Sequence, residues 1–254
     1  MDVTAAGPRA APTVPLASLA ARLDAAGLYG VFARHLLRLS PQLPVPVEGE
    51  VFAVGGPMHG RFEVGFAWCV GDDAGALTRL LRRIAGHGEL RAYVELAQLE
   101  ALVSALPHTR TSHDVLLVAS GRPAPPATAR VIAVDADVDR SGIDPEIARR
   151  LPPPHIWSRF GFAYHGLLVD DRVVAVLETT VDDGEHVAVQ QVFTASSMRG
   201  RGCGHALLTS VVEAQRRRGR TPIYVCAAEN AASIALARSA GFEPQLRLGL
   251  VEAG

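Results

Sequence analysis

Hydrophobic and polar positions follow two periods along the chain, one typical of helices and one typical of strands. Leucines and alanines recur at helical spacing from Leu16 to Leu39, with a break at Gly27, and again over Ala74–Ala85 and Ala97–Leu106. Short apolar runs between these helices predict strands. The runs are Val51–Val54, Phe62–Val70, Leu90–Val94 and Asp114–Ala119. The first half of the chain therefore predicts a mixed α/β domain.

The second half predicts an antiparallel meander followed by two helices. Its strands are separated by turns rich in aspartate and glycine, which hairpin turns favour. The expected strands are Arg130–Val134, Phe162–Val169, Val173–Thr180, Val187–Thr194 and Ile223–Ala228. A short helix is expected over Pro145–Arg150, and longer helices after Gly204 and over Ala231–Ala240. The second half therefore also mixes strands and helices.

A proline-rich segment, Ser120–Ala127, separates the two halves, because prolines remove backbone donors and favour an extended chain. The expected organisation is a disordered arm over residues 1–15, an α/β domain over 16–119, a linker over 120–127 and a second domain over 128–254. Three roles are left open for residues 16–119: a diverged half of the same fold, a cap that shapes the substrate site, or a homodimerisation element.

Composition excludes several classes of protein. The 254 residues are 48% hydrophobic and 20% charged, as in soluble globular proteins. A net charge of -1 gives no global reason to expect nucleic acid or an anionic membrane as a partner. All 25 basic side chains are arginine, which excludes lysine chemistry. The 3 cysteines are widely spaced and predict no metal site, and no apolar run reaches the roughly 20 residues of a membrane span, so a cytoplasmic location is expected.

The most informative stretch is Val192–Gly204, where a predicted strand ends, glycines alternate and a helix begins. The first turn of a helix leaves about four N–H groups without intrahelical partners, and the dipole adds roughly half a positive charge there. Glycines let a diphosphate approach the backbone, and Arg199 and Arg201 can add charge-assisted hydrogen bonds. The Gly-x-Gly-x-Gly spacing fits neither the dinucleotide fingerprint nor the P-loop. An anion-binding loop and an ordinary strand–turn–helix connection both explain the glycines.

Two segments resemble the GNAT superfamily of acetyltransferases. Its signature, Q/R-x-x-G-x-G/A, is similar at every position to the run from Arg199 to Gly204, and the preceding Val-Phe-Thr is similar to the strand end of one subgroup. Further on, Asn230 opens a helix that is closed by Gly241-Phe242, as in the family's last core pattern. The resemblance covers roughly residues 128–254. It implies an α/β (α+β type) fold with a mixed, mostly antiparallel central sheet flanked by helices, preceded by a smaller α/β N-terminal domain.

The resemblance also implies an N-acetyltransferase that uses acetyl-CoA as acyl donor, needs no metal, and acetylates an amine by direct attack on the thioester. A small-molecule amine is favoured as acceptor, because no acidic run suggests a basic protein tail as substrate. The cofactor residues carried over are Val192, Phe193, Thr194, Arg199, Gly200, Arg201, Gly202, Cys203, Gly204, His205, Ala206, Asn230 and Ser233.

Attack by the amine requires a general base. The candidates on the predicted central strands and beyond are Glu178, Gln190, Gln191 and Glu229. Glu178 is preferred because it is the only acid in an apolar strand, where burial can raise its pKa; a solvated glutamate at a sheet edge is the alternative.

One residue departs from the resemblance. Ala237 stands where the family often carries a tyrosine that is thought to protonate the departing thiolate, and Ser233 and Tyr224 are the substitutes that can be named. This departure keeps a second function open, a non-catalytic acyl-CoA-binding sensor or interaction module.

Overall fold

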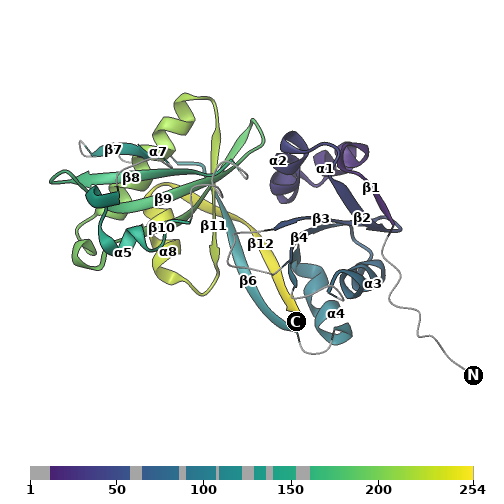
Figure 1. Ribbon diagram of the computed structural model, residues 1–254. Coiled ribbons are helices and arrows are strands. Elements are labelled where there is room, and N and C mark those ends of the chain that lie inside the picture. Colours follow the sequence, from purple (N-terminus) through teal and green to yellow (C-terminus); the bar gives the residue numbers. More distant parts are fainter. Residues whose placement is uncertain are drawn as a thin grey trace, which may run out of the picture. The chain divides into compact units, whose positions relative to one another are not determined.

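The computed structural model describes residues 12–57, 65–85, 90–106, 109–121, 129–135, 140–152 and 161–253. The chain forms two compact units (Figure 1), a first unit of Met1–Asp114 with Arg247–Gly254 and a second unit of Val115–Leu246. Most of the predicted arm and of the predicted linker lies outside the described residues. Thr13–Pro15, which were assigned to the arm, instead form a short strand that pairs with Pro44–Pro46.

The first unit alternates strands and helices as its hydrophobic pattern predicts. Its elements are β1 (Thr13–Pro15), η1 (Leu16–Leu19), α1 (Ala20–Ala25), η2 (Gly27–Gly30), α2 (Val31–Leu39), β2 (Pro44–Glu48), β3 (Val51–Pro57), β4 (Gly65–Val70), α3 (Ala74–Ala85), β5 (Leu90–Glu95), α4 (Leu96–Ala105) and β6 (Arg110–Ala119). The strands β1 to β4 pair antiparallel in sequence order, and β4 pairs parallel to β5. Leucines of α3 and α4 pack on these strands in one fully buried cluster.

The second unit has the same alternation. Its elements are β7 (Arg130–Val134), η3 (Arg140–Gly142), α5 (Pro145–Ala148), β8 (Ala163–Val169), β9 (Arg172–Asp182), β10 (His186–Thr194), η4 (Ser196–Met198), α7 (Cys203–Arg217), β11 (Thr221–Ala227), α8 (Ala231–Ser239) and β12 (Phe242–Ala253). The strands β7 to β10 pair antiparallel in sequence order, and β10 pairs parallel to β11. The predicted mixed, mostly antiparallel sheet flanked by helices is confirmed.

Each face of the second unit's sheet carries its own core. On one face, α7 and α8 pack against the sheet in a cluster that includes Val189, Leu207 and Tyr224. On the other face, the segment around α5 packs against the sheet in a cluster that includes Ile147 and Tyr164. A side chain's cluster therefore shows which face of the sheet it occupies.

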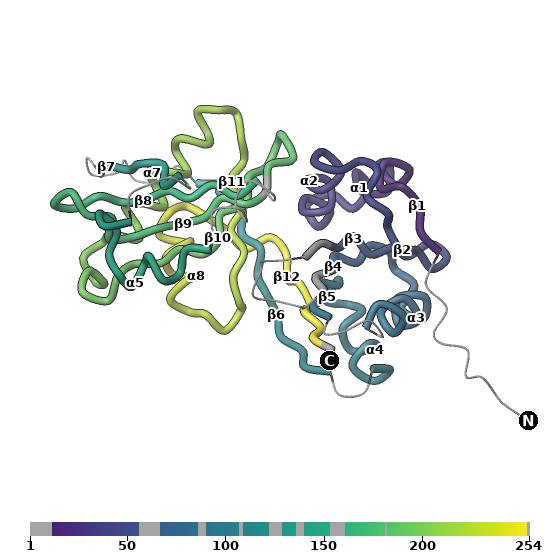
Figure 2. Tube along the Cα trace, in the orientation of Figure 1, coloured from purple at the N-terminus to yellow at the C-terminus, as the bar shows by residue number. Residues whose placement is uncertain are grey.

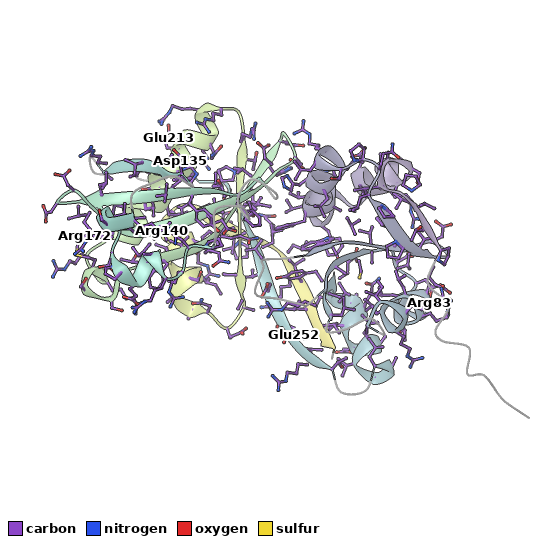
Figure 3. The ribbon with its side chains drawn as sticks, in the orientation of Figure 1. Arg83, Asp135, Arg140, Arg172, Glu213 and Glu252 are labelled. Atoms are coloured by element: carbon purple, nitrogen blue, oxygen red, sulfur yellow. The ribbon has the colours of Figure 1, made fainter. Side chains whose placement is uncertain are left out.

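Two long strands, β6 and β12, belong partly to each unit (Figure 2). Strand β12 lies next to β5, and the register is fixed by pairs such as Leu250 with Tyr93. Within this ladder Arg91 forms an ion pair of 2.5 Å with Glu252, which is labelled in Figure 3. Strand β6 lies next to β11. The sequence assigned residues 128–254 to one domain, whereas the structure places Arg247–Gly254 with the first unit, because their partners are on β5.

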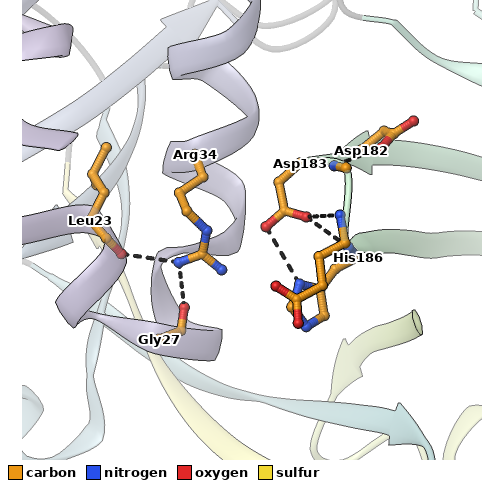
Figure 4. A network of polar contacts seen from close by, with 8 residues as sticks. Leu23, Gly27, Arg34, Asp182, Asp183 and His186 are labelled. Carbon is orange, nitrogen blue, oxygen red and sulfur yellow. Dashed lines mark hydrogen bonds and ion pairs between the residues drawn. The ribbon is translucent and has the colours of Figure 1, made fainter. Parts of the chain in front are cut away.

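Polar groups close the turns within each unit. In the first, Arg34 Nη1 donates to the carbonyls of Leu23 at 3.0 Å and Gly27 at 2.7 Å, and so ties α2 to the preceding turn (Figure 4). In the second, Asp183 Oδ1 accepts from the backbone N–H of His186 at 2.7 Å, which orders the β9–β10 turn. Among the described residues, no helix has both the length and the apolar character needed to cross a membrane.

Candidate functional site

The parallel strands β10 and β11 part halfway along their length. Their paired residues run from His186 with Thr221 to Val189 with Tyr224, and no further pair follows between them in the described residues. Among the described residues, Gln190–Thr194 on β10 therefore has no β11 partner on this side. Backbone groups without a ladder partner can instead bind an extended ligand as an added strand would.

A β-bulge turns β10 at the point where the strands part. Its register with β9 shifts between Gln190 and Phe193, and Gln191 has a left-handed φ of 53°. Such a bulge bends the strand locally and redirects the backbone groups that follow. The expected cofactor-contacting residues Val192, Phe193 and Thr194 thus form the diverging end of β10, and all three are partly exposed.

The glycine loop after β10 is open. Gly200 and Gly202 have left-handed φ values of +73° and +77°, and a Cβ atom at either would meet nothing within 4 Å. The backbone conformation thus favours glycine, and no atom of the described residues obstructs a side-chain position at either glycine. At Gly204, by contrast, a Cβ atom would lie 3.2 Å from Thr194 Oγ1, so this glycine lets α7 approach β10 closely.

Helix α7 begins in the loop without a side-chain cap. Its N-cap is Gly202, which has no side chain to bond the first-turn amides. The amides of Cys203, Gly204 and His205 lead the helix, where the dipole favours an anion. The amide of Ala206 already donates to the Gly202 carbonyl at 2.9 Å, unlike the expectation that it would face a ligand. The His205 ring lies 3.1 Å from the Ser239 carbonyl, so its side chain joins α7 to the end of α8.

The arginines of the loop have different surroundings. Arg199 Nε donates to the Thr194 carbonyl at 3.2 Å, and its Nη2 lies 3.4 Å from Glu146 Oε1. Glu146 also accepts from the backbone N–H of Ser196 at 2.8 Å, which lowers the pKa of its carboxyl, with Arg199 adding to the effect. Arg199 therefore braces the loop, whereas Arg201 is exposed and has no bond among the described residues.

At the opening of α8, Asn230 caps the helix, since its Oδ1 accepts from the backbone N–H of Ser233 at 3.0 Å. The Ser233 hydroxyl lies 2.9 Å from the Tyr224 hydroxyl. Tyr224 ends the β10–β11 ladder and is buried, which raises the pKa of its phenol. Three residues singled out separately in the sequence therefore form one connected group beside the parting.

Glu178 is buried, with 1% of its surface exposed, so the edge-facing alternative is wrong. Burial raises the pKa of its carboxyl from the ordinary 4.5 to about 7, and a hydrogen bond from the Tyr164 hydroxyl partly opposes this shift. The same burial, with the Glu178 charge, raises the pKa of Tyr164, which keeps that phenol protonated as the donor. A carboxyl that titrates near neutrality is suited to accept and release a proton.

The pair of Glu178 and Tyr164 and the pair of Ser233 and Tyr224 lie on opposite faces of the sheet. Tyr164, Glu178 and Gln190 are paired across three neighbouring strands, and side chains of paired residues share a face. Tyr164 belongs to the core beside α5, and Tyr224 belongs to the core beneath α7 and α8. Gln190 is also the first residue beyond the last β10–β11 pair. A ligand that threads the parting therefore has Glu178 on one side and Ser233 with Tyr224 on the other.

The contacts of two residues in this region were not predicted from the sequence. Glu146 anchors the loop from 50 residues away, and Tyr164 supports Glu178 from a different strand. Their roles depend on tertiary pairing, for which the chain carries no local signal. Among the described residues, no group of three or more His, Cys, Asp or Glu side chains could hold a metal ion.

Comparison with known proteins agrees with this geometry. Residues 134–242 match the model of the Acetyltransferase (GNAT) family, so a GNAT acetyltransferase domain occupies this part of the chain, within the region where the sequence resemblance placed it. The family indicates acetyl transfer as the reaction class. Among curated protein sequences, none matches this chain significantly.

Solved structures share the fold over most of the chain. A Drosophila protein aligns with a TM-score of 0.68 and 14% identity, covering 95% of this chain and 97% of that one. A GCN5-related N-acetyltransferase from Kribbella flavida aligns with a TM-score of 0.66 and 19% identity, covering 91% and 96%. A tandem GNAT protein from the clavulanic acid biosynthesis pathway aligns with a TM-score of 0.57 and 16% identity, covering 98% and 90%. At these identities the similarity concerns the fold.

Proposed function

We propose that the second unit binds acetyl-CoA and transfers its acetyl group to the amine of a small molecule. The observation that carries the proposal is the parting of β10 and β11 beside a helix that starts in an open, uncapped glycine loop. A pantetheine arm needs an extended backbone partner, and a pyrophosphate needs a concentration of amide donors. This part of the chain offers both, one directly after the other in the sequence.

In the proposed complex, the pyrophosphate accepts from the amides of Cys203, Gly204 and His205, and Arg201 adds a charge-assisted hydrogen bond. The pantetheine arm pairs with the backbone of Val192–Thr194. Asn230 uses its Oδ1 as a helix cap, which leaves its side-chain NH2 as the group to donate to the arm. This arrangement places the thioester where the strands part.

The neutral amine attacks the thioester carbon from the face that carries Glu178. The proton lost by the amine passes to the Glu178 carboxylate, which exists near neutral pH because its pKa is about 7. The carbon–sulfur bond then breaks toward the opposite face. There the Ser233 hydroxyl, held by Tyr224, donates to the departing thiolate. This pair replaces the tyrosine expected at the position of Ala237.

A second candidate function is a non-catalytic acyl-CoA sensor or interaction module. The observation that favours it is Ala237, which is fully buried and offers no proton donor. Both candidates require acyl-CoA binding, so turnover separates them.

The experiment is thiol release from acetyl-CoA with the full chain and a broad panel of small amines. We expect release above spontaneous hydrolysis for at least one amine, and loss of that release in Glu178→Gln. Binding of acetyl-CoA without amine-dependent release by any member of the panel would favour the sensor. Absence of binding would refute both candidates.

A further inference from the structure

The first unit repeats the strand order and the strand directions of the second. In each unit, four antiparallel strands lead into a helix and then into a strand parallel to the fourth, followed by a second helix and a last strand. In the first unit the parallel ladder ends at Trp68 with Tyr93, as it ends at Val189 with Tyr224 in the second. Beyond that pair, the described residues of β4 and β5 form no further pair with each other, although they still pair with β3 and β12 on their other sides.

From this repeat we infer that the first unit is a second copy of the acetyltransferase fold whose acyl-CoA slot is closed by its own side chains, so that each chain binds a single acyl-CoA, in the second unit. The inference rests on the proposed function for the location of the open slot. Two contacts within the first unit carry it, one at the parting of the strands and one at the start of the following helix.

Tyr29 fills the parting between β4 and β5. Its hydroxyl lies 2.6 Å from the carbonyl oxygen of Cys69 and 3.2 Å from that of Tyr93, one on each strand. Cys69 directly follows the last paired residue, so it corresponds to Gln190 of the second unit. The phenol thus bonds to the backbone position that a pantetheine arm would use.

The Tyr29 side chain is fixed by its neighbours. Only 4% of its surface is exposed, and its ring centroid lies 5.1 Å from that of Trp68, which also stacks on Phe32 at 4.6 Å. Burial raises the pKa of the Tyr29 phenol well above its ordinary value, so the hydroxyl remains a donor at physiological pH. Displacing this ring would break the hydrogen bond between its hydroxyl and the buried Cys69 carbonyl, which is costly.

At the start of α3, a carboxylate occupies the place where the second unit has glycine. Asp73 Oδ1 accepts from the backbone N–H of Ala76 at 2.9 Å and so uses a first-turn amide. Asp72 adds a second negative charge next to it, where the loop before α7 carries Arg199 and Arg201. A pyrophosphate at the start of α3 would be repelled by the negative charges of Asp72 and Asp73. It would also find the Ala76 amide already hydrogen-bonded, and both effects oppose binding.

The test combines stoichiometry with cysteine labelling on the full chain. Calorimetric titration should give one acetyl-CoA per chain for the wild type, and binding at least about hundredfold weaker for Gly202→Asp. A second binding event, or binding by Gly202→Asp with the affinity of the wild type, would overturn the inference. Acetyl-CoA should slow alkylation of Cys226, which is partly exposed on β11, and leave Cys69 unlabelled throughout.

A variant of Tyr29, the side chain that closes the slot, tests the inference without relying on cofactor binding. Tyr29→Ala should raise the alkylation rate of Cys69 by about tenfold or more, because loss of the ring and of its bond to the Cys69 carbonyl makes local opening at the end of β4 more frequent. Tyr29→Phe retains the ring and should raise the rate less, and far-UV circular dichroism checks that both variants fold. Rapid labelling of Cys69 in the wild type would show an open slot and refute the closure. If the wild type binds no acetyl-CoA, the proposed function fails, while the labelling of Cys69 still decides whether the slot is closed.

Discussion

Replacing Glu178 by glutamine should change how the stability of the protein depends on pH. The carboxyl has its pKa raised from 4.5 to about 7 in the folded protein, chiefly because it is buried. Between these values the native state holds a proton that the unfolded state has released. The free energy of unfolding of the wild type therefore falls as pH rises through this interval. Glutamine cannot ionise, so Glu178→Gln should lose this dependence.

The size of the effect follows from the shift. One unit of pKa corresponds to about 1.36 kcal/mol, so the interval from 4.5 to about 7 amounts to about 3 kcal/mol. The unfolding free energy of Glu178→Gln, relative to wild type, should rise by up to this amount between about pH 4.5 and about pH 8. Any constant cost of replacing the carboxyl beside Tyr164 shifts all values equally and does not affect the slope.

Urea denaturation at a series of pH values measures the difference in unfolding free energy between Glu178→Gln and the wild type. Intrinsic fluorescence and circular dichroism are followed together to test for two-state behaviour. Glu229→Gln is the matched control, because it makes the same substitution at an exposed position. A difference between Glu178→Gln and wild type that stays constant over the whole range would refute the raised pKa, and with it the main reason for choosing Glu178 as base.

Three further variants, with one control variant, test the partner of Glu178, the glycine loop and the proposed proton donor. Tyr164→Phe removes the hydrogen bond that lowers the pKa of Glu178, so the acidic limb of the pH profile of kcat/KM should move to higher pH; an unmoved limb would contradict the pairing. Gly202→Asp should weaken acetyl-CoA binding at least about hundredfold in calorimetry through like-charge repulsion. Gly219→Asp, at a φ of +76° and equally open, controls for backbone strain and should bind as wild type does. Ser233→Ala should lower kcat about ten- to hundredfold with little change in KM, and a raised KM with an unchanged kcat would indicate a binding role instead.

Local chemistry was enough to predict several elements and the glycine loop. Helix α3 has the bounds that its leucine spacing predicts, and β7 likewise matches its apolar run. The loop from Arg199 to Gly204 was predicted from its glycine spacing and its resemblance to the GNAT signature, and the structure gives each of its glycines a local reason, either a left-handed φ or a close approach. Amphipathic spacing and turn chemistry act within a few residues, so a single sequence carries them fully.

Long-range pairing could not be predicted in the same way. The partner of β12 is β5, more than a hundred residues earlier in the chain, and no periodicity within β12 identifies it. The same holds for Glu146 at the loop and for Tyr164 beside Glu178. The apolar strand around Glu178 left a buried and a solvated glutamate as alternatives, and nothing in it pointed to a phenolic partner, because cross-strand neighbours follow from register and not from composition.

The two units show that one backbone arrangement can either stay open for a ligand or be closed by the protein's own side chains. Where parallel strands part, carbonyl and amide groups lose their ladder partners and must find others, since buried backbone groups are rarely left unbonded. In the first unit Tyr29 supplies the missing donor, and Asp73 accepts from the helix that follows. In the described part of the second unit, β11 offers no partner to Gln190–Thr194, and Gly202 offers no side-chain cap. A strand end without a β11 partner, next to an uncapped helix start, is thus the physical reason to expect a ligand there, and the same parting, once filled from within, becomes ordinary protein core.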